Sequence, residues 1–259
     1  MKNIVIASDL SERSRPALRR AVDMAAETGA QLTVLHIVDA ALPEPLSQPV
    51  EVGARTMLSG QVAEDAGKRP LSVEITVAKG DAIQQITETV ARVEADLLIV
   101  GLHRRRAFLD QIRETTMEHL IRSSTVPVLL VTGSAEQAYT RVLAGVALSD
   151  VCAAALGHIA ALAPGADLTV FTAHEVSFRE EAERDYETWK AMHPLPQDLP
   201  YPVFIEARPE EALQDIMADQ SFDLLVIGGH TRSGAGRYIL GSLSATLIRK
   251  PPCDLLIAK

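Results

Sequence analysis

The stretch DLLVIGGHTRSGAGRYILGSLSATLIRK, Asp223 to Lys250, contains the order of elements on which the fold depends. It opens with DLLVI, a short and largely apolar run that is typical of a buried strand. Five glycines follow within residues 228–241, and the segment from Ser242 onward has the apolar spacing of a helix. A strand, a glycine-rich loop and a helix in this order favour an α/β fold.

The junction between the glycine-rich loop and the helix suits an anion. The start of a helix has unpaired N–H groups and a partial positive charge, and phosphate is the anion that most often binds there. The spacing is neither GxGxxG nor the GxxxxGK[ST] of a P-loop. Gly228, Gly241 and Ser242 are therefore candidate anion-binding residues. The alternative is that the two glycines serve turns and tight packing, and that Ser242 only begins a helix.

The same pattern occurs twice in the chain. DLLIVGLH (96–103) recurs as DLLVIGGH (223–230), and NIVIASDLS (3–11) matches RVLAGVALS (141–149). Two copies of one unit are indicated. We predict one domain over residues 1–133 and a second over 140–259, with the polar segment 132–139 as the linker.

Each copy alternates short Val-, Ile- and Leu-rich strands with amphipathic helices. Such strands are typical of parallel sheets covered on both faces. We therefore predict two tandem, open, doubly wound domains, each with a five-stranded parallel sheet whose ligands bind at the carboxyl ends of the strands. Strands are expected near 3–8, 31–37, 71–77, 96–100, 127–131, 141–147, 167–172, 202–206, 223–227 and 254–258. Helices are expected near 14–28, 55–67, 81–93, 113–123, 150–162, 175–191, 209–219 and 242–250.

Two proline-rich segments interrupt the pattern between the second and third strands of each copy. They are ALPEPLSQPVEVG (41–53) and HPLPQDLPYP (193–202). We expect ordered surface loops there, and a lid or a partner-binding segment is the alternative.

Composition excludes several classes. The formal charge of −9 opposes general nucleic-acid binding, and no apolar run reaches the ~18 residues of a membrane span. The apolar run at the N-terminus is too short for a secretory signal, so we expect a cytoplasmic protein. Cys152 and Cys253 form no CxxC pair, and the histidines show no metal-like spacing, so we expect no metal site.

Each half resembles the universal stress protein family, and the whole chain resembles its tandem-domain branch. The resemblance rests on IVIASDLSERSRPALRRAVDMA (4–25), LTVLHIVD (32–39) and the stretch from Val226 to the C-terminus. It implies an adenine nucleotide alpha hydrolase-like fold. It also implies pairing of the last strand of each half, which would give an intramolecular pseudo-dimer, and a further homodimer is compatible with it.

Family members that bind ATP have a signature of glycine, two residues, glycine, nine residues, and glycine with Ser or Thr. In the second half Gly228 and Gly241-Ser242 match, while Thr231 replaces the middle glycine. In the first half Gly101 matches, but Arg104 takes the middle place and Glu114-Thr115 the last. A carboxylate at position 114 would repel phosphate, so we expect the first phosphate loop to be degenerate.

The residue expected beside adenosine shows the opposite pattern, because the first half matches the family there and the second half does not. ATP-binding members usually have Asp at the end of the first strand, and this chain has Asp9 in the first half but Ala147 in the second. Since the phosphates carry most of the charge, we expect the second half to be the better site, with reduced affinity. The resemblance places Ala173 and Ile227 beside adenosine and the N–H of Leu243 beside the phosphates. Asp9 is a weaker candidate in the first half, either as a ligand residue or as a helix cap.

Three functions are compatible with these residues. The first is a stress-response regulator that binds ATP, with Mg, and is read by a protein partner. The second is a scaffold that has lost nucleotide binding. The third is a slow ATPase or a protein that autophosphorylates on Ser242 or Ser244. No nucleophile–base constellation stands out in the sequence, so we expect no enzyme.

Overall fold

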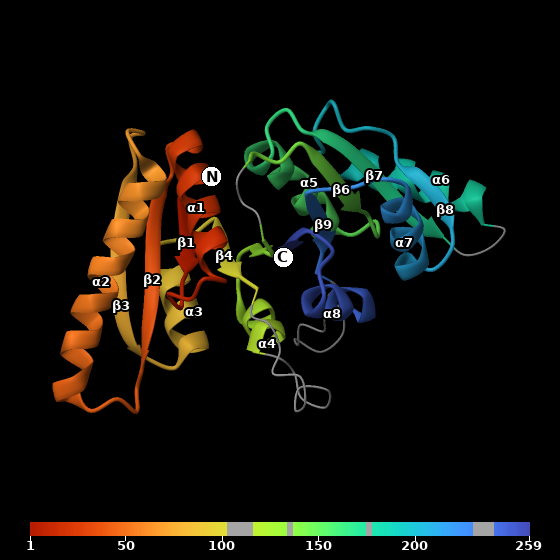
Figure 1. Cartoon of the computed structure of the whole chain (residues 1–259). Coiled ribbons are helices and arrows are strands. Elements are labelled where there is room, and N and C mark those ends of the chain that lie inside the picture. Colours follow the sequence, from red (N-terminus) through yellow and green to blue (C-terminus); the bar gives the residue numbers. More distant parts are fainter. Residues whose placement is uncertain (103–115, 134–136, 175–177, 230–240) are drawn as a thin grey trace. The chain divides into compact units, whose positions relative to one another are not determined.

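The computed structural model describes residues 1–102, 116–133, 137–174, 178–229 and 241–259. Their contacts divide the chain into two compact units, the first unit Met1–Gln137 and the second unit Ala138–Lys259. The division falls inside the polar segment 132–139. Each unit is an α/β domain built on a parallel sheet, as the alternating pattern predicted (Figure 1).

In the first unit the strand order is β3-β2-β1-β4-β5, and every pair is parallel. Helix α1 packs beside α2, and α3 packs beside α4. The chain runs from β1 through β2 to β3 on one side of the sheet and then returns to β4 and β5 on the other, so right-handed crossovers place these two helix pairs on opposite faces. The elements are β1 (Asn3–Ala7), α1 (Arg15–Thr28), β2 (Gln31–Asp39), α2 (Glu44–Ala66), β3 (Ser72–Gly80), α3 (Ala82–Arg92), β4 (Leu97–Gly101), α4 (Thr116–Ser123) and β5 (Val128–Val131).

The second unit repeats this topology with the order β8-β7-β6-β9-β10. Its central strand β6 lies between β7 and β9, so the chain winds in opposite directions from this point and the sheet is doubly wound. The elements are β6 (Arg141–Gly145), α5 (Asp150–Leu162), β7 (Asp167–His174), α6 (Arg179–Met192), β8 (Val203–Glu206), α7 (Pro209–Asp219), β9 (Leu224–Gly228), α8 (Ser242–Arg249) and β10 (Asp254–Ala258).

An aspartate lies just before β4 and again just before β9. Each one holds the start of the neighbouring central strand, β1 in the first unit and β6 in the second. Asp96 accepts a hydrogen bond from the Asn3 N–H at 2.9 Å, and Asp223 accepts one from the Thr140 N–H at 2.7 Å. Burial alone would raise the pKa of Asp96, but the backbone N–H groups of Lys2 and Asn3 lower it overall. The aspartate of the repeated DLL sequence therefore holds neighbouring strands in register.

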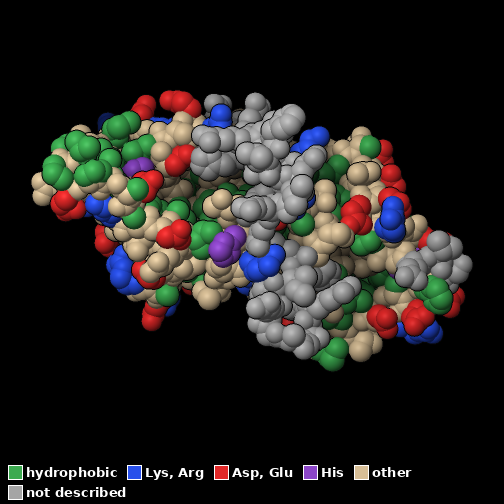
Figure 2. All heavy atoms as spheres, turned by 90° about the horizontal axis from the view of Figure 1, so that it is seen from below, with side chains coloured by type: hydrophobic (Ala, Val, Ile, Leu, Met, Phe, Trp, Pro, Cys, Tyr) green, Lys and Arg blue, Asp and Glu red, His purple; other side chains and the backbone are tan. Residues whose placement is uncertain are grey.

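One sequence prediction is wrong in the first unit. The prolines of residues 41–53 predict a loop, but α2 already begins at Glu44 and continues through Pro49. Prolines are tolerated in the first turn because those N–H groups have no helical partner; Pro45 lies there, and Pro43 is the residue just before the helix. On α2 the side chains of Leu46, Val50 and Met57 are about half exposed. Figure 2 shows apolar side chains gathered at the left end of the view. The second proline-rich segment, 193–202, is a loop, as predicted.

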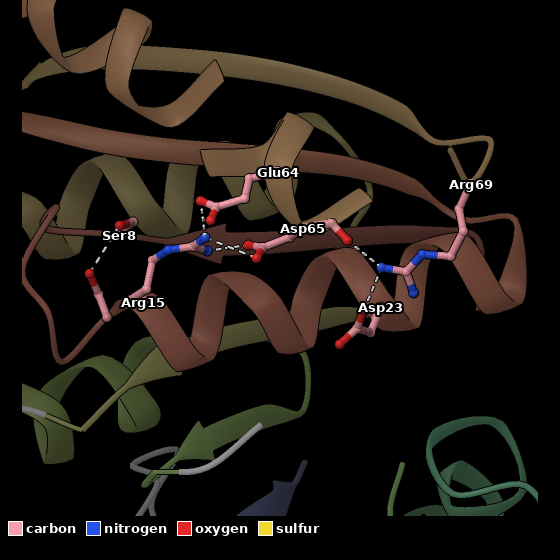
Figure 3. A network of polar contacts seen from close by, with 7 residues as sticks. Ser8, Arg15, Asp23, Glu64, Asp65 and Arg69 are labelled. Atoms are coloured by element: carbon pink, nitrogen blue, oxygen red, sulfur yellow. Dashed lines mark hydrogen bonds and ion pairs between the residues drawn. The ribbon is translucent and has the colours of Figure 1, made fainter. Parts of the chain in front are cut away.

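An ion pair ties the end of α2 to the start of α1 (Figure 3). The Arg15 guanidinium donates to both carboxylate oxygens of Asp65, one of them at 2.9 Å, and also to Glu64 at 3.0 Å. The Asp65 side chain is only 6% exposed, whereas that of Glu64 is 76% exposed. The hydrogen bond to Asp65 raises the pKa of Arg15, so the guanidinium is held charged at this contact.

In the second unit α6 and α5 follow the same strands as α2 and α1 do in the first. Trp189 and His193, at the end of α6, contact the start of α5. The Trp189 ring is buried, and its Nε1–H donates to the Ser149 carbonyl at 3.2 Å, immediately before α5. His193 lies 2.7 Å from the Trp189 carbonyl through Nδ1 and 2.9 Å from the Asp150 carboxylate through Nε2. Both ring nitrogens face acceptors, so only the doubly protonated imidazolium donates to both.

Replacing Asp65 by Asn should destabilise the first unit by about 1–3 kcal/mol, because it leaves a charged guanidinium without its buried partner. Calorimetric unfolding measures the change. Glu64→Gln is the matched control, since it removes an exposed carboxylate from the same arginine and should cost less than about 0.5 kcal/mol. Equal losses of unfolding free energy in the two variants would contradict the view that Asp65 is the stabilising partner of Arg15.

The contact of His193 should make the second unit more stable in mild acid. Hydrogen bonding to the Trp189 carbonyl, followed by that to Asp150, raises the pKa of His193 above its unfolded value of about 6.5. The stabilisation is then fully present below pH ~6.5 and is lost as pH rises through the folded pKa. Unfolding followed by the fluorescence of Trp189 should give wild type a larger free energy of unfolding than His193→Gln at about pH 6. The difference should be smaller at about pH 8. A difference that is independent of pH would rule out the imidazolium.

Candidate functional site

The candidate site of the second unit lies where the carboxyl ends of β6 and β9 diverge. Gly145 of β6 pairs with Ile227 of β9, and the chain then continues in one direction to Ala147 and in the other to Gly228. Ala147 is exposed and Gly228 is partly buried. This is the switch point of the sheet, the place where doubly wound folds bind ligands.

A close approach of two backbones shapes this crevice. A Cβ placed on Gly228 would lie 2.8 Å from the Cys152 sulfur, in the first turn of α5, and 3.3 Å from the Cys152 nitrogen. The Ala147 N–H in turn points to the same sulfur at 3.3 Å. Packing therefore favours glycine at position 228, whether or not a ligand is bound. The buried Cys152 acts here as a small packing residue.

The first unit has the same close approach. A Cβ on Gly101, at the end of β4, would lie 2.9 Å from the Arg13 carbonyl oxygen and 2.9 Å from the Ser14 Cα. Both neighbours are backbone atoms just before α1. The repeated glycine thus allows the end of one strand to pack against the start of the first helix in both units.

The turn after the central strand also has the same shape in both units. Leu10 has φ = 62° and Leu148 has φ = 47°, a left-handed conformation that costs a non-glycine residue about 1–2 kcal/mol. In the first unit Asp9 accepts hydrogen bonds from the Ser11 N–H at 3.0 Å and the Ser11 hydroxyl at 2.7 Å. Asp9 is not the cap of α1, since that position belongs to Ser14. In the second unit Ala147 offers no such acceptor, and the turn keeps its shape without one.

The adenosine-side candidates lie at the same end of the second sheet. Ala173 is partly buried near the end of β7, two residues after Phe171, whose carbonyl accepts from the Val146 N–H at 2.9 Å. Ile227 is only 5% exposed. It belongs mainly to the core beneath the crevice, and little of its surface is open to a ligand.

The start of α8 carries the phosphate-side candidates. Gly241 is the residue before the helix, with φ = −66° and ψ = 163°, and Ser242 and Leu243 begin it. The Ser242 hydroxyl donates to the Glu210 carboxylate at 2.9 Å. Glu210 lies in the first turn of α7, which follows the carboxyl end of β8, so this contact places Ser242 at the same end of the sheet.

Several sequence candidates lie outside the described residues. They are Thr231 in the second half and Arg104, Glu114 and Thr115 in the first. Glu210, by contrast, is a residue that the sequence reasoning missed. Its signal was the acidic first turn PEE, which is typical of an ordinary helix start. Ser244 is 3% exposed, which makes it a poor position for modification, whereas Ser242 is exposed.

No described helix is long and apolar enough to cross a membrane. Within the part of the chain that the structure describes, no group of three or more His, Cys, Asp or Glu side chains is placed to hold a metal ion.

Replacing Gly228 by Ala should destabilise the second unit by about 1–3 kcal/mol, because the new methyl group meets the Cys152 sulfur. Denaturation followed by Trp189 fluorescence measures this loss. The double variant Cys152→Ala/Gly228→Ala removes that sulfur and should recover part of the loss relative to the sum of the two single variants. Strictly additive effects would show that the sulfur is not the obstacle.

Comparisons with known proteins agree with the duplicated architecture. The family described as the universal stress protein family matches residues 1–132 and 138–259. The universal stress protein A homolog of Haemophilus ducreyi is 28% identical over 138 residues, which cover 50% of this chain and 95% of that protein. The stress response protein NhaX of Bacillus subtilis is 26% identical over 167 residues, which cover 49% of this chain and 96% of that protein.

Solved structures extend the likeness to both units. A universal stress protein from Archaeoglobus fulgidus has a TM-score of 0.76 at 17% identity, over 99% of this chain and 98% of its own. A functionally unknown protein from Pseudomonas aeruginosa has a TM-score of 0.71 at 19% identity, over 99% of this chain and 92% of its own. At these identities the likeness shows the fold. With two family matches that together span almost its whole length, the chain belongs to the universal stress protein family and carries that family's domain twice.

Proposed function

We propose that the protein binds an adenine nucleotide, with ATP and Mg as the reference ligand, at the crevice of its second unit. Binding would change the conformation of a surface that a protein partner of the stress response recognises, and the nucleotide would not be hydrolysed. The observation that carries the proposal is the start of α8. Gly241, Ser242 and Leu243 lie there at the carboxyl end of the sheet, where free N–H groups and the helix dipole favour phosphate.

The second unit is the better candidate because it keeps Gly241-Ser242 at the start of α8. In the first unit the matching pair is Glu114-Thr115, where a carboxylate would repel the ligand. In the first unit the Ser11 N–H and hydroxyl both donate to the Oδ1 atom of Asp9, which orients this carboxylate within its own turn. The missing acceptor at Ala147 lowers the affinity of the second unit without distorting its turn.

A scaffold that binds no nucleotide is the second candidate. The observation that favours it is the contact between Ser242 and Glu210, since the hydroxyl expected to meet phosphate already donates to a carboxylate of the protein. Such a protein would act through its surface alone. The two functions differ in one measurable property, the effect of nucleotide on the stability of the second unit.

The test combines detection of bound nucleotide with thermal shift. Protein purified without added ligand and then denatured should release an adenine nucleotide, and Mg-ATP at about 100 times its dissociation constant should add about 2.7 kcal/mol of stability. Ala147→Asp, which restores the acceptor on an already suitable turn, should tighten binding by about 0.5–1.5 kcal/mol.

Gly241→Glu is the loss-of-binding variant, because it copies the residue at the matching place in the first unit. The backbone angles of Gly241 suit any residue, so the variant tests charge with little strain. Binding of ATP should be lost while the unfolding temperature without ligand stays close to that of wild type. A chain that releases no nucleotide and shows no shift with ATP, AMP or adenosine would favour the scaffold.

A further inference from the structure

A carboxylate occupies the phosphate side of the proposed site. The Oε1 atom of Glu210 accepts the Ser242 hydroxyl at 2.9 Å, where α7 and α8 meet. Glu210 is partly buried, and Ser242 is exposed. The carboxylate lies at the positive end of α8, so it takes the electrostatic place that a phosphate oxygen would take.

Among the described residues, the neighbouring cation Arg208 hydrogen-bonds to Glu211 and also interacts with the charge of Glu210. The Arg208 guanidinium donates to Glu211 at 2.7 Å and 3.1 Å, and the Glu211 carboxylate also accepts from the Arg208 backbone N–H at 3.4 Å. The hydrogen bond to Glu211 raises the pKa of Arg208, and the same contact lowers the pKa of Glu211. Two adjacent glutamates thus differ in role. Glu211 is paired with a cation, whereas the side chain of Glu210 contacts a neutral hydroxyl.

We propose that Glu210 determines which adenine ligands the second unit accepts, by disfavouring any whose phosphates reach the start of α8. A triphosphate that approached Ser242 would have to displace this carboxylate and then lie beside it, with like charges in contact. Adenosine brings no charge to this position, and adenosine monophosphate carries a shorter, less charged tail. The ligand class that follows is the adenine nucleoside or mononucleotide, ahead of the triphosphate.

This inference rests on the proposed function and is tested with the full-length chain. The dissociation constants of adenosine, AMP and ATP are measured by titration calorimetry for wild type, Glu210→Gln and Glu211→Gln. Glutamine keeps the size of the side chain and an oxygen for Ser242 but removes the charge. Glu211→Gln is the matched control, because it removes the same charge one residue away and leaves the contact with Ser242 in place.

Glu210→Gln should tighten ATP binding about tenfold, a gain that shrinks at high salt because the repulsion is screened. Adenosine binding should change less than about twofold, because an uncharged ligand feels no repulsion from the carboxylate. Glu211→Gln should leave the ratio of ATP to adenosine affinity as in wild type. Thermal unfolding of each variant without ligand checks that the fold is retained. If Glu210→Gln unfolds, Glu210→Asp, which draws the charge back from Ser242, should shift the ratio in the same direction.

The outcomes separate the two proposals. Adenosine binding with an ATP affinity that is the same in wild type and Glu210→Gln would overturn the role of Glu210 and leave the nucleotide site standing. An equal gain in Glu210→Gln and Glu211→Gln would also overturn it, because the effect would then follow overall charge. Failure of all three ligands to bind any variant would refute the nucleotide site itself, and this inference with it.

Discussion

Both units depend on a glycine at a place where a side chain would force its neighbours to move. At the end of β4 and of β9 the strand passes so close to the start of the neighbouring helix that even a methyl group would meet backbone or sulfur atoms at 2.9 Å or 2.8 Å. This approach fixes the start of α1 and α5 relative to the sheet. The turns that carry Asp9 and Ala147 are fixed by it as well. A glycine that looks like a ligand-binding residue in the sequence is therefore first a residue of the fold.

The two units also share a tendency to satisfy polar groups of the crevice with their own side chains. In the first unit the Asp9 carboxylate accepts from Ser11, and in the second unit the Ser242 hydroxyl donates to Glu210. A ligand that accepts from the Ser242 hydroxyl would exchange an existing hydrogen bond for a new one, so its net gain from that bond is modest. Binding strength at such a site depends on how readily these internal partners leave, in addition to how well the ligand fits.

The sequence allowed most of the fold to be predicted, because short apolar strands and alternating helices depend on local pattern. The exception was α2, where three prolines suggested a loop, although one of them precedes the helix and another lies in its first turn, which tolerates proline. The site was less predictable. The Glu210–Ser242 contact joins two helices through side chains far apart in sequence, and no periodicity carries that information. The packing role of Gly228 likewise depends on the position of Cys152, which only the folded chain defines.

The left-handed leucines show that the backbone of the turn and the chemistry displayed on it are separable. Leu10 and Leu148 hold the same unusual conformation, although one follows a carboxylate and the other a methyl group. A single exchange at that neighbouring position can therefore change what a crevice recognises and leave its scaffold intact. Two crevices of one polypeptide can in this way share a backbone and still differ in the chemical groups that they offer.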